Sequence, residues 1–249
     1  NTFFCFENGY FALFPFIDEK EFKRGSLPDK AIISLGEMLG RMHLLGGKAK
    51  LPINNKFKTW EKEKILTHIE LIKSEINKKE ILNDFDKLTL ESVELKKNLI
   101  SKGFVEHESF NLPNDHLIHG DYLESNVFFG ENNQVSHVFD FEKTNYSPRV
   151  YELFRSLMYV FLSEEITDED INKAKSYLNS YLNFYPTSKD ELRRGLKFYY
   201  TKSIHGLWVE YEHYLKNNNR ADEFLLSDFR RIKYLSEHFN ELEVKLLGN

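Results

Sequence analysis

The feature that most constrains the fold of this sequence is the stretch from residue 116 to residue 143, HLIHGDYLESNVFFGENNQVSHVFDFEK. It contains two polar clusters, each flanked by short apolar runs. The first cluster holds His119, Asp121 and Asn126, and the second begins at Asp140. Side chains of these types can bind a cation or take part in proton transfer, so we treat both clusters as a candidate site.

The two apolar runs between the clusters predict a β-hairpin. Residues 127–129 and 135–141 are rich in Val and Phe, and the polar residues 131–134 connect them. Short runs of this composition, joined by a polar segment, are typical of paired strands. The hairpin is expected to fold Asp140 back beside Asn126.

This pairing suits phosphoryl transfer. Asp121 could accept a proton from an attacking hydroxyl or orient it. The amide oxygen of Asn126 and a carboxylate oxygen of Asp140 could bind Mg²⁺, which prefers oxygen ligands and often keeps phosphate oxygens in its shell. We assign His119 to the catalytic group, mainly as a hydrogen-bonding support of the loop.

Composition excludes several classes of protein. The 249 residues carry a net charge of -5 with no basic stripe, which argues against nucleic acid as a partner. No apolar run approaches the roughly 18 residues of a membrane span, and no signal peptide is visible. A single cysteine, Cys5, rules out an internal disulfide framework and suits the cytoplasm.

The rest of the chain reads as one hairpin followed by helices, which predicts an α+β fold. The aromatic-rich residues 2–17 surround Asn8-Gly9, a strong hairpin signal. Apolar residues then recur at helical spacing in most of the remaining segments. The expected helices cover residues 28–46, 60–79, 85–101, 150–162, 168–185, a segment capped by Ser188, and 222–247.

The two polar clusters resemble motifs of a known family. His119-Gly120-Asp121 with Asn126 is similar to the H-G-D-x-x-x-x-N loop of the aminoglycoside phosphotransferase and choline kinase-like family, and Asp140-Phe141-Glu142 is similar to its D-F-x metal motif. Protein kinases carry H-R-D and D-F-G instead. The resemblance is therefore to the small-molecule kinases.

Three further segments support this resemblance, which covers most of residues 3–160. ISLGEMLGRMH, ending at His43, is similar to the family's helix after the hinge, and ALFPFI (12–17) to its hinge strand. PRVYELFRSL (148–157) is similar to the segment after the metal motif, with Glu152 where the family usually has Asp. The resemblance gives His43 and Glu152 supporting roles.

The resemblance implies a protein-kinase-like fold that binds ATP and Mg²⁺. Residues 1–17 would be the last strands of the N-terminal lobe and the hinge, and residues 18–249 the helical C-terminal lobe. Adenine would meet the hinge around Phe14 and Phe16. No phosphate-covering loop or strand Lys is visible, so we expect further residues upstream of this sequence.

The function expected from these features is transfer of the ATP γ-phosphate to a hydroxyl of a small molecule, such as an aminoglycoside, choline, homoserine, or another amino alcohol or sugar. Three alternatives remain open: a catalytically inactive kinase-like nucleotide-binding protein, a protein kinase, and a metal-dependent phosphohydrolase. The short distance between Asp140 and Pro148 argues against a protein kinase, because it leaves no room for an activation segment.

Four residues are candidates for contact with the acceptor. Glu142 follows the metal motif, and Trp208, Glu210 and Tyr211 lie close together in HGLWVEYEHY. Aromatic faces and carboxylates attract cations, so these residues favour a cationic acceptor. The competing interpretation is that the aromatic residues belong to the core and that Glu142 is solvated.

Overall fold

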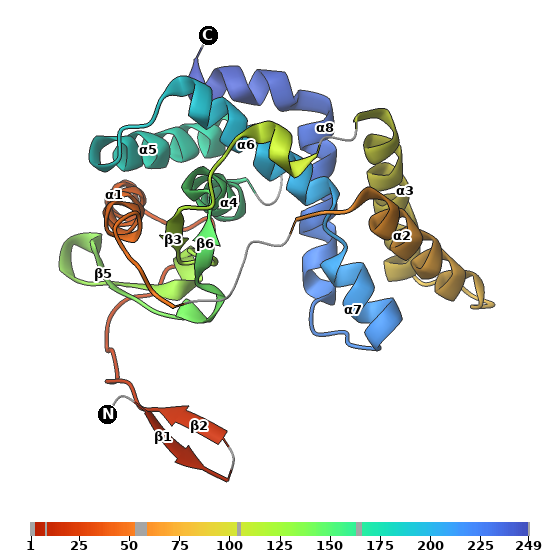
Figure 1. The fold of residues 1–249 in the computed structure, drawn as a ribbon, viewed down its shortest axis with the longest axis horizontal. Coiled ribbons are helices and arrows are strands. Elements are labelled where there is room, and N and C mark those ends of the chain that lie inside the picture. The colour runs from red at the N-terminus through yellow and green to blue at the C-terminus, as the bar shows by residue number, and fades with distance from the viewer. Residues whose placement is uncertain (1–2, 8, 53–58, 104–105, 163–165, 249) are drawn as a thin grey trace.

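Helices dominate the part of the chain that this computed structural model describes, which is residues 3–7, 9–52, 59–103, 106–162 and 166–248. Figure 1 shows the helices gathered into a body around a few short strands, with one hairpin projecting from it. No helix in these ranges is both long and apolar enough to cross a membrane.

The larger hydrophobic core lies among the helices that surround residues 116–143. These helices are α1 (Asp29–Gly46), α4 (Arg149–Phe161), α5 (Asp168–Phe184), α6 (Lys189–Ile204) and α8 (Leu225–Leu247). Helix α1 packs directly along α5 because Gly36 presents no side chain there. A Cβ atom at Gly36 would lie 2.4 Å from the carbonyl oxygen of Tyr177.

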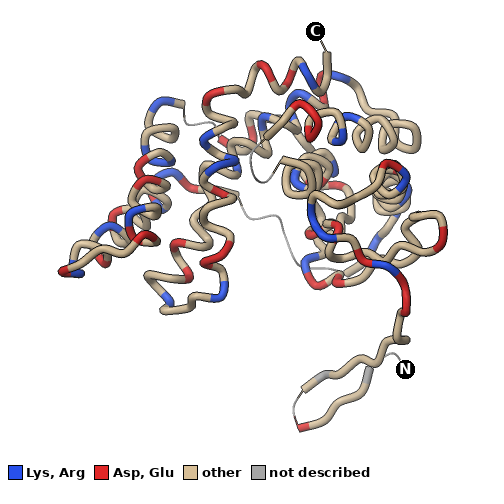
Figure 2. The backbone as a smooth tube through the Cα atoms, turned by 180° about the vertical axis from the view of Figure 1, so that it is seen from behind, with Lys and Arg blue, Asp and Glu red and all other residues tan. Residues whose placement is uncertain are grey.

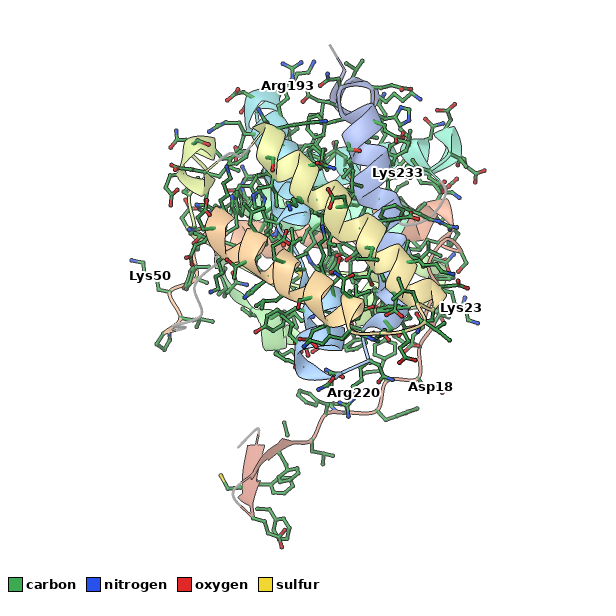
Figure 3. All side chains as sticks on the ribbon, turned by 90° about the vertical axis from the view of Figure 1, so that its right-hand side faces the viewer. Asp18, Lys23, Lys50, Arg193, Arg220 and Lys233 are labelled. Carbon is green, nitrogen blue, oxygen red and sulfur yellow. The ribbon has the colours of Figure 1, made fainter. Side chains whose placement is uncertain are left out.

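A second hydrophobic cluster forms beside the first. It contains α2 (Lys62–Asn77) and α3 (Asp84–Gly103), which lie side by side in Figure 3, together with residues of α7 (Trp208–Lys216) and α8. Isoleucines of α2 at helical spacing, among them Ile65, Ile69 and Ile72, are buried in it. Helix α8 therefore contributes to both clusters and joins them.

The predicted β-hairpin between the polar clusters is confirmed. Strand β4 (Val127–Phe129) pairs with β5 (Val135–Val138) in antiparallel register, with Val127 opposite Val138. The second strand ends three residues earlier than predicted, because Asp140 adopts a left-handed backbone conformation with φ of 64°.

A further strand pair was not predicted. Strand β3 (His116–Ile118) pairs with β6 (Asn145–Ser147), two three-residue strands on either side of the two polar clusters. Each is too short to show a periodic pattern. Their pairing closes the stretch into a loop, which brings the residues after Asp140 back to the chain before His119.

The hairpin near the start of the sequence is also confirmed. Strands β1 (Phe3–Phe6) and β2 (Gly9–Ala12) pair with Phe6 opposite Gly9. Gly9 of the predicted Asn8-Gly9 turn is thus already paired, and Asn8 is outside the described residues. Figure 2 shows the strands of this hairpin almost without charge, whereas both signs are mixed along the helices of the body.

Most predicted helices are observed within two residues of their expected ends. Helix α1 follows Pro28, and α5 begins after a Thr167 capping box. Ser188 caps α6 through the backbone amide of Glu191. The last predicted helix begins later than expected, because residues 222–224 form a separate 3₁₀ turn before α8.

Candidate active site

The candidate catalytic loop begins where β3 ends, and its course depends on Gly120. This residue has φ of +87°, which L side chains rarely adopt. A Cβ atom here would lie 2.2 Å from the carbonyl oxygen of Lys143. Glycine at this position therefore lets the loop pass directly beside the segment that follows Asp140.

Glu152 on α4 holds this loop in place. Its carboxylate accepts hydrogen bonds from the backbone amides of His119, at 3.0 Å, and of Gly120. It also accepts one from Nε2 of His43, at 2.9 Å, while Nδ1 of His43 lies 2.9 Å from the hydroxyl of Tyr181. Burial lowers the pKa of His43, and this effect outweighs the opposite influence of Glu152.

Both ring nitrogens of His119 make hydrogen bonds to backbone groups of the protein. Its Nε2 donates to the carbonyl of Phe139 at 2.8 Å, and its Nδ1 accepts from the backbone amide of Asp121 at 3.2 Å. The imidazole proton is therefore on Nε2, because a carbonyl can only accept and a backbone amide can only donate. His119 connects the loop to the β4–β5 hairpin.

Asp121 faces two cationic side chains. One carboxylate oxygen lies 2.5 Å from Nζ of Lys143, and the other lies 2.6 Å from Nη2 of Arg155. Burial raises the pKa of Asp121, but Arg155 and Lys143 together have the larger effect, so its pKa is lowered. Asp121 is therefore held as a carboxylate with a fixed orientation.

Asn126 and Asp140 lie at the same end of the β4–β5 hairpin. The backbone amide of Phe139, next to Asp140, donates to the carbonyl of Asn126 at 3.1 Å. The side-chain amide of Asn126 donates to the carbonyl of Asp121 at 2.8 Å, which leaves its oxygen available. Within the described residues, the exposed Asp140 carboxylate has no hydrogen bond or ion pair.

This pair fits a magnesium ion that binds together with phosphates. Two oxygen donors from the protein suffice for Mg²⁺ when phosphate oxygens and water complete its shell. The described part of the chain contains no group of three His, Cys, Asp or Glu side chains that could hold a metal ion. The donor set is therefore unlike that of a structural metal site.

A cavity of about 600 Å³ opens beside Asp121. Helices α4, α6, α7 and α8 form its walls, and it is of a size typical for small-molecule ligands. Trp208, a candidate for contact with the acceptor, lines it with a half-exposed indole ring. Tyr211 and Glu142 do not line it: Tyr211 packs against His68, and Glu142 is exposed.

Glu210 does not line the cavity either. It is 1% exposed and lies between α7 and α3. Its carboxylate accepts hydrogen bonds from the hydroxyl of Ser92, at 2.9 Å, and from Nζ of Lys96, at 2.6 Å. Glu210 thus connects two helices. Helical spacing predicts that Glu210 lies one turn from Tyr214, but it could not show which face of the helix is buried.

Phe14 and Phe16 are among the most exposed aromatic residues, at 79% and 91%. They follow β2 in the segment that joins the first hairpin to the body, and they do not line the cavity. In the described part of the chain, no backbone hydrogen bond involves residues 13–19. Their backbone groups are therefore available to a ligand.

The sequence analysis missed Lys143 and Arg155, the two partners of Asp121. A signal for Arg155 was present, since it follows Glu152 by three residues on α4 and so lies on the same face of the helix. Because Glu152 was expected to support the loop, Arg155 on the same face of the helix could also have been expected to lie near the loop. Lys143 had no comparable signal, because its position depends on the β3–β6 pair.

Solved structures similar to this one are small-molecule kinases. A choline kinase from Cryptosporidium parvum Iowa II has a TM-score of 0.57 at 16% identity, over 93% of this chain and 72% of that one. An aminoglycoside phosphotransferase from Alicyclobacillus acidocaldarius has a TM-score of 0.60 at 12% identity, over 97% and 74%. A spectinomycin phosphotransferase, solved with ADP and spectinomycin, has a TM-score of 0.53 at 17% identity, over 98% and 73%. These likenesses confirm the predicted kinase-like α+β fold.

Comparison with curated protein sequences gives no match. Residues 5–192, in contrast, match the phosphotransferase enzyme family APH. The matched range contains both polar clusters, Glu152 and most of the first hairpin, and it spans most of the chain. The chain therefore belongs to the phosphotransferase enzyme family.

Proposed function

We propose that this protein transfers the γ-phosphate of ATP to a hydroxyl group of a small molecule. Asp121 orients the acceptor hydroxyl and takes up its proton. Arg155 and Lys143 fix the position of the Asp121 carboxylate, and Glu152 fixes the loop that carries it. Catalysis by positioning of this kind accounts for much of the rate in phosphoryl transfer, whose transition state is loose.

The observation that carries this proposal is the position of Asp121 at the meeting point of two features. On one side is a cavity large enough for a small acceptor. On the other are Asn126 and Asp140, whose side-chain oxygens have no partner in the described residues. A hydroxyl in the cavity and a phosphate at the hairpin would both approach Asp121.

Asn126 and Asp140 would hold Mg²⁺. When bound, the ion would neutralise charge on the ATP phosphates. The exposed backbone around Phe14 and Phe16 is where adenine would bind, which agrees with the proposed division into a hinge at residues 1–17 and a helical lobe at 18–249. The structural neighbours that bind choline or spectinomycin give examples of acceptors on this fold.

One observation favours the alternative of an inactive nucleotide-binding protein. Both carboxylate oxygens of Asp121 are already paired with cations, and its lowered pKa makes it a weak base. A weak base is nevertheless sufficient where the hydroxyl loses its proton late, as in a loose transition state. Activity distinguishes the two functions.

The test is phosphate transfer from ATP and Mg²⁺ to a panel of amino alcohols, aminoglycosides, sugars and hydroxy acids, using the full-length protein. We expect Asp121→Asn to lower turnover by about 10²- to 10⁴-fold while the protein still folds, as judged by its circular dichroism spectrum. Asp84→Asn, at an exposed carboxylate on α3, is the matched control and should retain activity. Wild-type turnover in Asp121→Asn would exclude the assigned role, and nucleotide binding without transfer to any acceptor would support the alternative.

A further inference from the structure

The cavity beside Asp121 has more positive than negative charge. Among the described residues that line it, five side chains are cationic and two are acidic. The cationic residues are Arg24, Lys143, Arg155, Lys202 and Arg231. The acidic residues are Asp121 and Asp228. The wall is aromatic, as the sequence led us to expect, but its charge balance is opposite to the acidic one expected.

Both acidic residues are already engaged. Asp121 pairs with Lys143 and Arg155. One oxygen of Asp228 pairs with Arg231, and the other accepts a hydrogen bond from Nε1 of Trp208 at 3.3 Å. A cationic acceptor would therefore have to compete with protein cations at Asp121, and with Arg231 and Trp208 at Asp228.

Arg231, in contrast, has hydrogen-bonding capacity to spare. Its side chain is 2% exposed, and only its Nη2 is paired, with Asp228. The Nε and Nη1 groups are buried and have no hydrogen-bond partner. The guanidinium lies 4.0 Å from the ring centroid of Tyr159, which offers a π face but no strong acceptor. Buried donors without an acceptor are costly and rare in folded proteins.

Arg231 lies within reach of a molecule that also contacts Asp121. Arg155, which touches Asp121, lies 4.9 Å from the centroid of the same Tyr159 ring. The two guanidinium groups are thus separated by no more than the sum of their distances to that centroid. Asp121 and Arg231 also line the same cavity, so one ligand bound there can contact both side chains.

We propose that the acceptor carries an oxyanion, a carboxylate or a phosphate, which accepts a hydrogen bond from an unpaired donor of Arg231. This inference rests on the proposed function, since it describes the acceptor of that same site. A guanidinium makes stronger, charge-assisted hydrogen bonds to anionic oxygens than to neutral acceptors, so an oxyanion suits these unpaired donors. The acceptor hydroxyl then lies at Asp121, and Lys202 adds positive charge on the same wall. The acceptor class therefore differs from the cationic one that the sequence favoured.

Binding to matched probes tests the inference without requiring activity. Glucuronate, glucose 6-phosphate, glucose and glucosamine share one scaffold and differ in charge, and calorimetry on the full-length protein measures each affinity. We expect one or both of the anionic probes to bind at least about tenfold more tightly than glucosamine, consistent with charge-assisted hydrogen bonds. The two anionic probes also distinguish a carboxylate from a phosphate.

Variants of neighbouring arginines identify the residue responsible. Arg231→Met should weaken binding of the anionic probe by about 10- to 100-fold, whereas Arg230→Met, at the exposed adjacent position on α8, should not. Asp228→Asn removes the carboxylate that competes for Arg231, so it should tighten anion binding. A fold defect could not cause that gain.

Three results would overturn the inference: tighter binding of glucosamine than of either anionic probe, no saturable binding of any anionic probe, or equal anion affinity in wild type and Arg231→Met. Failure of the proposed function looks different. In that case no probe receives phosphate from ATP, yet an anionic probe still binds and still depends on Arg231.

Discussion

At the scale of single residues, one glycine decides where the candidate catalytic carboxylate lies. Gly120 brings the loop against the carbonyl of Lys143, and the side chain of Lys143 then pairs with Asp121. In the same loop conformation, the backbone amides of His119 and Gly120 donate hydrogen bonds to the carboxylate of Glu152. A side chain at position 120 would disturb all of these contacts together.

Comparing replacement of Gly120 with replacement of Gly25 separates the cost of backbone strain from the cost of steric overlap. Gly120 and Gly25 both have positive φ, of +87° and +78°, but only at Gly120 would a Cβ atom meet other atoms within 4 Å. Gly25→Ala should therefore cost about 1–2 kcal/mol of unfolding free energy from backbone strain alone. Gly120→Ala should cost about 1–3 kcal/mol more, from overlap with Lys143. Urea unfolding measures both, and equal losses would show that the overlap is relieved at no cost.

The sequence predicted the residues that lie within one continuous motif and missed those that long-range pairing brings in. Asp121, Asn126 and Asp140 stand at fixed spacing around a hairpin, so local reasoning brought them together correctly. Arg231 comes from a helix about a hundred residues further along the chain, and its guanidinium reaches the cavity only because α8 joins both hydrophobic clusters. Nothing in its local sequence shows that contact.

At the scale of elements, periodicity predicted where helices lie but not which face is buried. The α7 segment shows this clearly, because Trp208 lines the cavity while Glu210 points to α3. The helical repeat of the sequence cannot distinguish a carboxylate that contacts a ligand from one that contacts a buried lysine. The pair of Lys96 and Glu210, both about 2% exposed, joins α3 to α7 in the smaller cluster.

This buried pair gives a prediction for the α3–α7 contact. Lys96→Met leaves the Glu210 carboxylate buried without its cation, which should cost about 3–5 kcal/mol of unfolding free energy. The double variant Lys96→Met/Glu210→Leu removes both charges and should recover most of that loss. Denaturant unfolding of the single and double variants measures the coupling. Additive losses would mean that the two residues do not stabilise each other, and Lys97→Met, at an exposed neighbour, serves as the control.

At the scale of the whole molecule, stability depends on pH through histidines that the fold buries. Burial lowers the pKa of His43, His107 and His205 from their ordinary value of 6.5. His43 joins α1, α4 and α5 through Glu152 and Tyr181, so its protonation would disturb the centre of the larger cluster. As the pH falls, the loss of folding stability therefore begins with protonation of imidazoles rather than of carboxylates.

The sign of this response follows from proton uptake. Below pH 6.5 the unfolded chain binds protons at these histidines, while the folded chain does not until its lower pKa values are reached. Stability is therefore full above pH 6.5 and falls as the pH decreases through the window below it, with a slope of up to about 1.4 kcal/mol per pH unit for His43. Asp121, whose pKa is lowered from 3.8, adds a loss only in more acidic solution.

Urea unfolding at pH 7.5, 6.5 and 5.5 measures the slope, and a pair of variants assigns it. His43→Gln keeps a donor for Glu152 and an acceptor for Tyr181 but cannot be protonated, so it should reduce the slope by up to one proton. His238→Gln, at an exposed position of α8, should leave the slope unchanged. An unchanged slope in His43→Gln would show that His43 is protonated equally in the folded and unfolded chains, and the loss of stability would then have to come from His107 and His205.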